Sequence, residues 1–302
     1  MESGNTVKRK RSFGRSLLFF VLGAVAIFCV SLVVAILLPK SMIAPENQIA
    51  IVEIKGMITS SGDIVRQIKL YEEDENIHGI VLRIDSPGGS VAPSQEIYNA
   101  VLKAKENNTK IFASLGNLAA SGGYYIASAA DTIVSNPGTL TGSIGAIMAF
   151  SNMEELMNKV GMQPEVIKSG PFKDTGSFSR PMSKDERALL QAVVDDVHEQ
   201  FVGAVAAGRN LPFKEVAQIA DGRIYTGRQA LKLKMVDKLG SLQDTIDLLA
   251  EELGMTDKPN IVREEEDVNF FDWLLQSSLS KNLRASLIPS PSPSLQYLWV
   301  AQ

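Results

Sequence analysis

The chain has 302 residues, of which 45% are hydrophobic, so it can bury the core of one large α/β domain or two small ones. The first 15 residues hold five of the 30 basic and one of the 34 acidic side chains, which leaves 25 basic against 33 acidic and a net charge of −8 for the rest. This acidic balance argues against nucleic acid as a partner. A single cysteine, Cys29, excludes a disulfide framework and a cysteine-rich zinc site, and we expect no metal and no cofactor.

An uncharged apolar run, SLLFFVLGAVAIFCVSLVVAILLP, occupies residues 16–39. At about 1.5 Å per residue it is long enough to cross a hydrocarbon core of roughly 30 Å, and it predicts one transmembrane helix. A cleaved signal peptide is the alternative, but its apolar region would be shorter and would end in a small-x-small site. Because five basic residues precede the run and only Lys40 follows closely, we expect a single-pass protein of the cell membrane. Residues 1–15 would be cytoplasmic, and everything after the span extracytoplasmic.

Beyond Pro45, short β-branched runs alternate with a helical pattern. Strands are predicted at residues 48–54, 79–84, 110–115, 131–137 and 165–170, with a helix at 94–107. This alternation is typical of parallel βαβ units, so the fold class is α/β. Further helices are predicted at 183–209, 213–220 and 242–253, where they would cover the sheet or mediate assembly.

The domain that follows the span is expected to cover residues 46–256, and residues 257–302 form a C-terminal extension of different character. The extension contains the run PSPSPS, which is typical of a stiff connector, and ends in the apolar segment LQYLWVAQ. The alternating apolar side chains behind a stiff connector suggest that this segment lies extended in a neighbouring groove.

One serine is surrounded by small residues in the stretch NLAASGGYYIASAA, residues 117–130. A hydroxyl at Ser121 would lie at the first turn of a helix, where free N–H groups and the helix dipole favour developing negative charge. The Gly122 N–H could then donate to an oxyanion, and the small neighbours would admit a substrate backbone. The alternative is that Ser121 only caps its helix, which serine does often.

A second stretch, RIDSPGGS at residues 83–90, leaves a predicted buried strand through a Pro-Gly-Gly turn. Such a turn permits positive φ and exposes backbone donors. Because α/β proteins place their sites in loops at the carboxyl ends of parallel strands, Gly88 and Gly89 are candidates for the other half of an oxyanion hole. A plain turn is the alternative.

A nucleophilic serine also needs a base, and the chain has only two histidines. His78 precedes a strand at the end opposite the expected site, and His198 is expected on a solvated helix face. A lysine base is therefore favoured, and it must be neutral near pH 7. Lys173 is the candidate base, and Lys168 is its rival for that role. The alternative is that Lys173 is an ordinary exposed loop lysine paired with Asp174.

Taken together and in order, the motifs DSPGGS, LAASGGYYIA, SGPFKD and GRIYTGRQALKLKMVDKLGS resemble the signal peptide peptidase A family of membrane-bound serine peptidases. The resemblance covers residues 48–253, and the single amino-terminal span suits the family's short form. It implies these roles: Ser121 as nucleophile, Lys173 as general base, Gly88 or Gly89 with Gly122 as oxyanion donors, and Ser143 of TGSIGAI orienting the lysine.

The resemblance further implies a crotonase/Clp-protease-like fold of repeated ββα units after the transmembrane helix. It implies a homo-oligomeric ring in which serine and lysine come from adjacent protomers, and apolar peptides such as cleaved signal peptides as substrates. Three alternatives stay open at this point: a related membrane peptidase that cuts specific membrane proteins, a crotonase-type acyl-CoA enzyme, and a non-catalytic membrane scaffold.

Overall fold

The computed structural model describes residues 20, 22–31, 47–264 and 295–299. The chain divides into two units, Met1–Glu46 and Asn47–Gln302. In the first unit, residues 22–31 are helical and lie inside the predicted span, most of whose other residues fall outside the described ones. Within the part of the chain that is described, no helix is both long and apolar enough to cross a bilayer.

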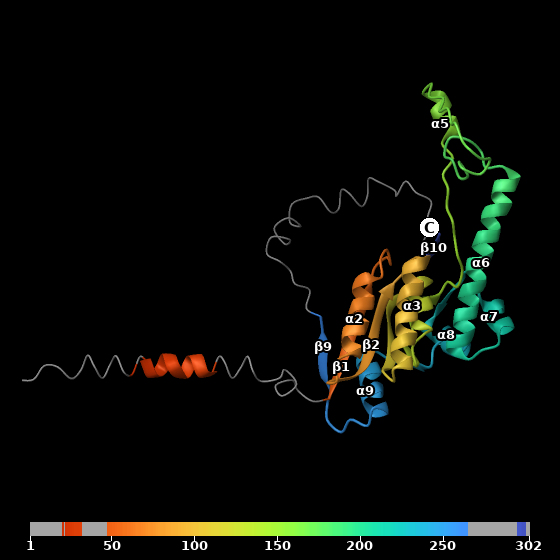
Figure 1. The fold of residues 1–302 in the computed structure, drawn as a ribbon. Coiled ribbons are helices and arrows are strands. Elements are labelled where there is room, and N and C mark those ends of the chain that lie inside the picture. Colours follow the sequence, from red (N-terminus) through yellow and green to blue (C-terminus); the bar gives the residue numbers. More distant parts are fainter. Residues whose placement is uncertain (1–19, 21, 32–46, 265–294, 300–302) are drawn as a thin grey trace, which may run out of the picture. The chain divides into compact units, whose positions relative to one another are not determined.

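A mostly parallel sheet forms the centre of the second unit (Figure 1). Its main path runs in the order β7 (Ile224–Thr226), β6 (Leu140–Gly142), β4 (Lys110–Ala120), β2 (Ile77–Ser86), β1 (Gln48–Lys55) and β9 (Asn260–Arg263). Two further strands, β5 (Thr132–Ser135) and β8 (Lys238–Leu239), branch from β4. All pairs are parallel except β6 with β7. The predicted α/β class is confirmed.

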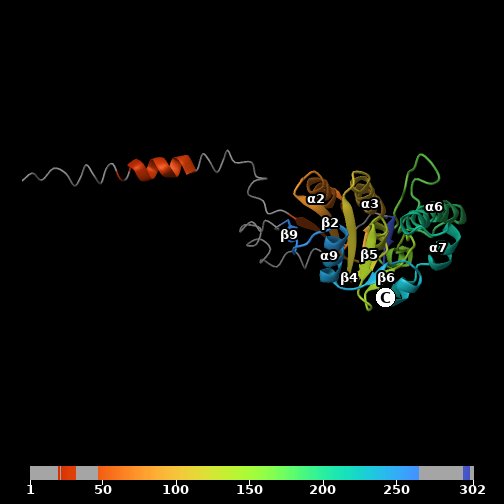
Figure 2. The ribbon, with the colours of Figure 1, turned by 90° about the horizontal axis from the view of Figure 1, so that it is seen from below.

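Alternate side chains of the strands are buried on opposite faces of the sheet. One face packs against α2 (Gly62–Glu72) and α3 (Val91–Glu106), and the other against α9 (Leu242–Glu252), as Figure 2 shows. In β1, Val52 joins the α2/α3 side and Ile51 the α9 side. Each fully buried residue of this kind contributes about 1.5–3 kcal/mol, so both layers hold the strand ends in place.

The predicted strands at 48–54, 79–84, 110–115 and 131–137 correspond to β1, β2, β4 and β5. The strand predicted at 165–170 is wrong, because the chain there is irregular. Its apolar side chains Val166 and Ile167 are exposed instead of packed in the sheet, and Ile167 is 97% exposed. β-branched residues alone therefore gave a misleading signal in this segment.

A long excursion separates β6 from α6 (Lys184–Arg209), and residues 147–182 of it are called the arm below. The arm carries the short helix α5 (Glu154–Lys159) and stands away from the sheet beside the amino-terminal end of α6 (Figure 1). Helix α6 begins at a capping box in which Ser183 and Glu186 exchange hydrogen bonds. It returns the chain to the core, where α7 (Phe213–Ile219) and α8 (Gly227–Lys232) follow.

Candidate active site

The candidate site lies at the carboxyl ends of three neighbouring strands, β2, β4 and β6. Ser86 of β2 pairs with Ala119 of β4, and Ala120 pairs with Gly142 of β6. The loops that leave these strands are therefore side by side. They carry the predicted residues Gly88, Gly89, Ser121, Gly122 and Ser143, so the sheet brings together every predicted site residue except the lysine.

Ser121 occupies the turn between β4 and α4 (Gly122–Ala127) with φ of 54° and ψ of −118°. Two backbone bonds hold it there: its N–H donates to the Gly142 carbonyl, and its own carbonyl accepts from the Tyr125 N–H, both at 2.8 Å. Positive φ at a residue with a side chain costs about 1–3 kcal/mol and marks functional positions. Such a strand-to-helix elbow is the geometry that presents a nucleophilic serine.

The Ser121 side chain is buried, at 1% exposure, yet its Oγ has no hydrogen-bond partner among the described residues. It makes no capping bond to α4, so the capping alternative is wrong. A buried hydroxyl without a partner costs about 1–3 kcal/mol unless something else satisfies it. The main chain is therefore fixed while the hydroxyl is available for an incoming group.

Glycines allow the backbones around Ser121 to approach closely. Gly88 has φ of +96°, and a methyl group on it would lie 2.7 Å from the Gly122 nitrogen and 3.0 Å from Ser121 Cβ. A methyl on Gly122 would lie 3.3 Å from the Gly89 nitrogen. Because the Gly88 N–H already donates to Ser86 Oγ at 3.0 Å, Gly89 and Gly122 remain the candidates for an oxyanion hole. Gly89 belongs to the short strand β3 (Gly88–Ser90), which leads into α3.

Lys173 lies in the arm, exposed, in a turn where its N–H donates to the Gly170 carbonyl at 3.2 Å. Since Ser121 Oγ has no partner among the described residues, Lys173 of the same chain makes no hydrogen bond to it. The alternative in which Lys173 pairs with Asp174 is not found. Asp174 binds Lys168 at 2.5 Å and Arg180 at 2.8 Å instead. The rival Lys168 is therefore engaged in an ion pair.

The loop that carries Lys173 is held by an ion-pair network that sequence reasoning missed. Arg180 bridges Asp174 and the buried Glu186, which it contacts at 2.5 Å. Arg180 and then Lys168 lower the pKa of Asp174, and Arg180 and then the Ser183 backbone N–H lower the pKa of Glu186 to about 2. The sequence signal was the capping motif S-x-x-E at residues 183–186. Its Glu186 caps the helix and also accepts from Arg180, which lies three residues before the motif.

Ser143 follows β6, is buried and has φ of 50°. With His198 and Asp195 it lines an open cavity of about 590 Å³ that also includes Leu298 and Trp299. The solvated face predicted around His198 is confirmed for its neighbours Asp195, Asp196 and Glu199, which are exposed. His198 itself is half-buried, and its Nε2 is buried and has no partner among the described residues. His78 is exposed near the amino end of β2, away from the site, as expected.

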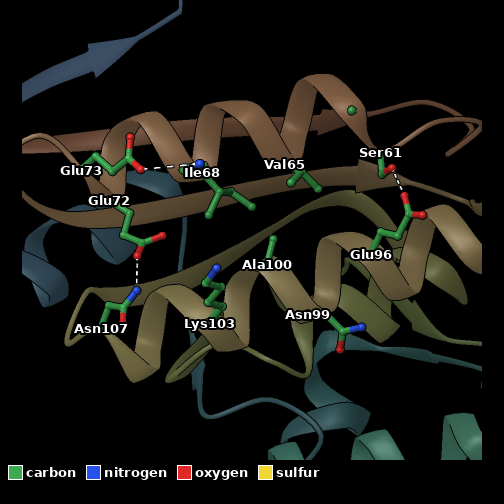
Figure 3. Close-up of a pocket in the computed structure, with 12 residues that line it drawn as sticks. Ser61, Val65, Ile68, Glu72, Glu73, Glu96, Asn99, Ala100, Lys103 and Asn107 are labelled. Atoms are coloured by element: carbon green, nitrogen blue, oxygen red, sulfur yellow. Dashed lines mark hydrogen bonds and ion pairs between the residues drawn. The ribbon is translucent and has the colours of Figure 1, made fainter.

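A second open groove, of about 730 Å³, runs between α2 and α3 (Figure 3). Side chains reach across it in two places: Ser61 donates to Glu96, and Asn107 donates to Glu72. None of the predicted site residues is among the described residues that line it. Despite its volume, this groove is separate from the candidate active site.

Comparison with known proteins identifies the family. Residues 103–256 match the model of Peptidase family S49, and residues 39–137 match that of Clp protease. The chain belongs to peptidase family S49. It is 48% identical over 201 residues to "Putative protease slr0021" of Synechocystis sp., covering 66% of this chain and 72% of the relative. It is also 34% identical over 245 residues to "Putative signal peptide peptidase SppA" of Enterococcus faecium, covering 76% and 71%.

A plant relative, "Serine protease SPPA, chloroplastic" of Arabidopsis thaliana, is 30% identical over 215 residues, 67% of this chain and 32% of that protein. The S49 membership confirms the resemblance to the signal peptide peptidase A family and makes the chain a serine-type endopeptidase. It decides against the crotonase-type acyl-CoA enzyme and the non-catalytic scaffold. The Clp protease match agrees with the parallel-dominated sheet.

Proposed function

We propose that this S49 peptidase works with a Ser–Lys dyad in which Ser121 of one subunit is activated by Lys173 of a neighbouring subunit. The observation that carries the proposal is the buried Ser121 hydroxyl, which lies beside the backbone of Gly88 and Gly122 and lacks a partner among the described residues. The missing partner is a base. Within the same chain, Lys173 is carried on the exposed arm.

In the proposed reaction, neutral Lys173 takes the proton from Ser121 as its Oγ attacks the peptide carbonyl carbon. The N–H groups of Gly89 and Gly122 hold the oxyanion that forms. Collapse of this intermediate breaks the C–N bond, and Lys173 gives the proton to the leaving amine. Water then attacks the acyl-enzyme by the reverse route and regenerates Ser121. Ser143 orients the lysine from the end of β6.

The proposed source of the lysine is supported by the surface of the arm, which exposes large apolar side chains: Met153, Leu156, Val160, Met162, Val166, Ile167, Phe172 and Phe178. A concentration of exposed apolar groups of this kind marks an interaction surface. A second copy of this chain would cover these side chains and bring Lys173 to its Ser121. We therefore propose a homo-oligomeric ring with dyads shared between protomers.

The proposed substrates are apolar peptides left in the membrane, such as cleaved signal peptides. The support is the name of the Enterococcus faecium relative together with the apolar run at residues 16–39, which would anchor the chain beside such peptides. In this proposal the amino terminus is cytoplasmic and the peptidase domain extracytoplasmic. A related peptidase that cuts specific membrane proteins differs only in the client.

The test uses the full chain in detergent, a fluorophosphonate probe and hydrolysis of a synthetic signal peptide. Wild type should be labelled and active, and Ser121→Ala should lose both labelling and hydrolysis. Lys173→Ala should lose hydrolysis, whereas the matched variant Lys168→Ala should retain at least about a tenth of it. Hydrolysis that survives Ser121→Ala, or loss with Lys168→Ala but not Lys173→Ala, would contradict the assignment.

Location needs a separate measurement, because the dyad would work with or without an anchor. Isolated membranes washed with alkaline carbonate should retain the full chain, and protease added from the extracytoplasmic side should digest its peptidase domain. Release of the chain by the wash, or protection of the domain from that protease, would contradict the proposed anchor or its orientation.

A further inference from the structure

The groove between α2 and α3 has an apolar floor, to which Val65 and Ile68 contribute from one helix and Ala100 from the other (Figure 3). All the described residues that line it lie within 61–73 and 96–107, so its walls are these two helices and their ends. The two cross-groove hydrogen bonds fix the spacing of the helices. A hydrophobic groove between two helices is a shape that receives the apolar face of a third helix.

The described chain reaches one wall of this groove at Glu264. After β9, the Glu264 carboxylate pairs with Arg66 of α2 at 3.4 Å. Burial and then the Glu264 carboxylate raise the pKa of Tyr71, which is also on α2, so Glu264 lies against that helix. Residues 265–294 follow, and they fall outside the described ones. Their path therefore starts at the helix that forms one wall.

The described chain resumes at the other wall. The Leu295 carbonyl accepts from the N–H of Val91, the first residue of α3, at 3.4 Å. The residues after it form the extended strand β10 (Gln296–Leu298), which pairs antiparallel with β3. The 30 residues from 265 to 294 thus connect the two helices that form the groove. Tethering at both ends raises the effective concentration of this connection at the groove.

Within the connection, residues 269–279 (NFFDWLLQSSL), called the aromatic segment below, have the spacing of an amphipathic helix. Phe270, Trp273 and Leu274 occupy positions i, i+3 and i+4, which places them on one helical face, with Asp272 and Gln276 on the other side. A helix of this length spans about 16 Å. Helix α2 also has 11 residues, so the aromatic segment matches the groove in length.

The residues before the aromatic segment can carry the chain across α2. In both ribbon views β9 and α3 lie on opposite sides of α2, so the chain has one helix to cross (Figures 1 and 2). Five extended residues, 265–269, reach about 17 Å, whereas a helix with its side chains is about 10–12 Å across. The first three are acidic, and α2 exposes Arg66 and Lys69 one turn apart. Charge therefore favours this crossing.

We propose that the aromatic segment docks as an amphipathic helix in the α2/α3 groove of its own chain, with Phe270, Trp273 and Leu274 against the apolar floor. The occupant belongs to the same chain because both ends of the connection are held at the walls of the groove. Residues 280–294, which include PSPSPS, lead from the groove to β10. The inference does not depend on the proposed dyad, since none of these residues belongs to the candidate active site.

The first test measures proximity with introduced cysteines in the full chain in detergent. Cys29→Ala removes the native thiol. Ala100→Cys is then combined in turn with Phe270→Cys, Trp273→Cys or Leu274→Cys, and each chain is oxidised. At least one pair should give an intrachain disulfide, identified by mass spectrometry of the linked peptides, because a disulfide forms only where the two Cα atoms come within about 7 Å.

In the matched control, Leu189→Cys takes the place of Ala100→Cys, since Leu189 is 44% exposed on α6 and lies outside the groove. The best Ala100 pair should exceed its control in intrachain yield by at least about fivefold. Equal yields would overturn the docking. Disulfides that join two chains would overturn the choice of occupant and would assign the groove to a second copy.

The second test follows the fluorescence of Trp273. Trp299→Phe leaves Trp273 as the only tryptophan, because the chain has two. Adding Ala100→Glu should shift the emission to longer wavelength and increase its quenching by acrylamide, because a carboxylate in the apolar floor keeps its water and excludes an apolar face. Ala192→Glu is the matched control, since it places the same charge on an exposed residue of α6.

Emission that is the same with and without Ala100→Glu would overturn the docking. If brominated lipid also quenches that unchanged emission, the segment lies on a bilayer surface instead. A melting curve accompanies each variant. Should Ala100→Glu unfold the chain, the cysteine pairs decide alone, since Ala100→Cys adds only a sulfur atom to the groove.

Discussion

Two regions contribute to the proposed chemistry in opposite ways. One is formed by the carboxyl ends of β2, β4 and β6, and the other is the arm. At the strand ends, the backbone is fixed by the sheet, the groups are small and buried, and Ser121 is held at positive φ by two backbone hydrogen bonds. On the arm, the chain is irregular, large apolar side chains are exposed, and charged side chains hold the loop. The proposed nucleophile is thus positioned by strand pairing within one chain, whereas the proposed base is carried by a segment whose large apolar side chains are exposed.

This difference teaches that the two halves of the proposed dyad depend on different physical conditions. The serine side requires only that one chain folds, because its neighbours are fixed by strand pairing and glycine geometry. In the proposal, the lysine side requires assembly, since exposed apolar side chains on the arm would gain stabilisation only if a second surface covered them. Variants on the two sides should therefore fail in different ways, and the following predictions use that difference.

The largest effect is expected at the lysine itself. Lys173→Ala should lower kcat by a factor of about 10³ or more with an unchanged Tm and oligomer, because it removes the base without touching the core. Lys168→Ala should cost at most about tenfold through loosening of Asp174. Steady-state kinetics with a melting curve for each variant measures both. A comparable kcat for the two variants would contradict the assignment of Lys173.

The next effect lies on the serine side. In Gly89→Ala the new methyl would lie 2.1 Å from the Ile58 carbonyl oxygen, so β3 must move away from Gly122. We expect a fall in kcat of about 10² together with a lower Tm, because one oxyanion donor is displaced. Gly138→Ala is the matched control, since nothing lies within 4 Å of its added methyl. Full activity in Gly89→Ala would place the oxyanion hole elsewhere.

The strand ends were predictable from sequence, and the arm was only partly so. The β-branched runs predict the strands β1, β2, β4 and β5. Glycines beside a serine at a strand end indicate a site built from backbone N–H groups. Both signals are local in the sequence. The predicted strand at 165–170 failed because its apolar residues are exposed on the arm, where burial by the same chain does not explain them. The capping motif at residues 183–186 indicates Glu186 but not Arg180, which also binds it. The alternating apolar residues of LQYLWVAQ predict an extended, docked segment, but they do not indicate that Tyr297 donates to the Val197 carbonyl, because those two residues are far apart in the chain.

A smaller effect is expected from the apolar surface of the arm. Ile167→Asp places a charge on a residue that is 97% exposed, so it should leave the fold and Tm intact while weakening assembly. Activity should fall about tenfold at low concentration and recover at high concentration. Sedimentation and activity across a dilution series measure this, with Leu70→Asp on α2 as the control. Loss of activity that is independent of concentration would contradict a role in assembly.

The smallest effect concerns the network that holds the Lys173 loop. Because Arg180 lowers the pKa of Glu186 to about 2, from an ordinary value near 4.5, the paired carboxylate stabilises the fold above pH 4.5. That contribution is lost as pH falls from about 4.5 towards 2. The Tm difference between wild type and Arg180→Gln should therefore be constant above about pH 5 and shrink below it. A difference that grows on acidification would contradict this linkage.

The most direct test mixes two inactive chains. Ser121→Ala and Lys173→Ala are purified separately, dissociated, mixed and reassembled, and signal-peptide hydrolysis is compared with each variant treated alone. Sharing of the dyad between subunits predicts that the mixture regains a measurable fraction of wild-type activity, because some Ser121 hydroxyls then meet Lys173 from the other chain. A mixture that forms mixed oligomers yet stays as inactive as its parents would contradict a lysine supplied by the neighbouring subunit.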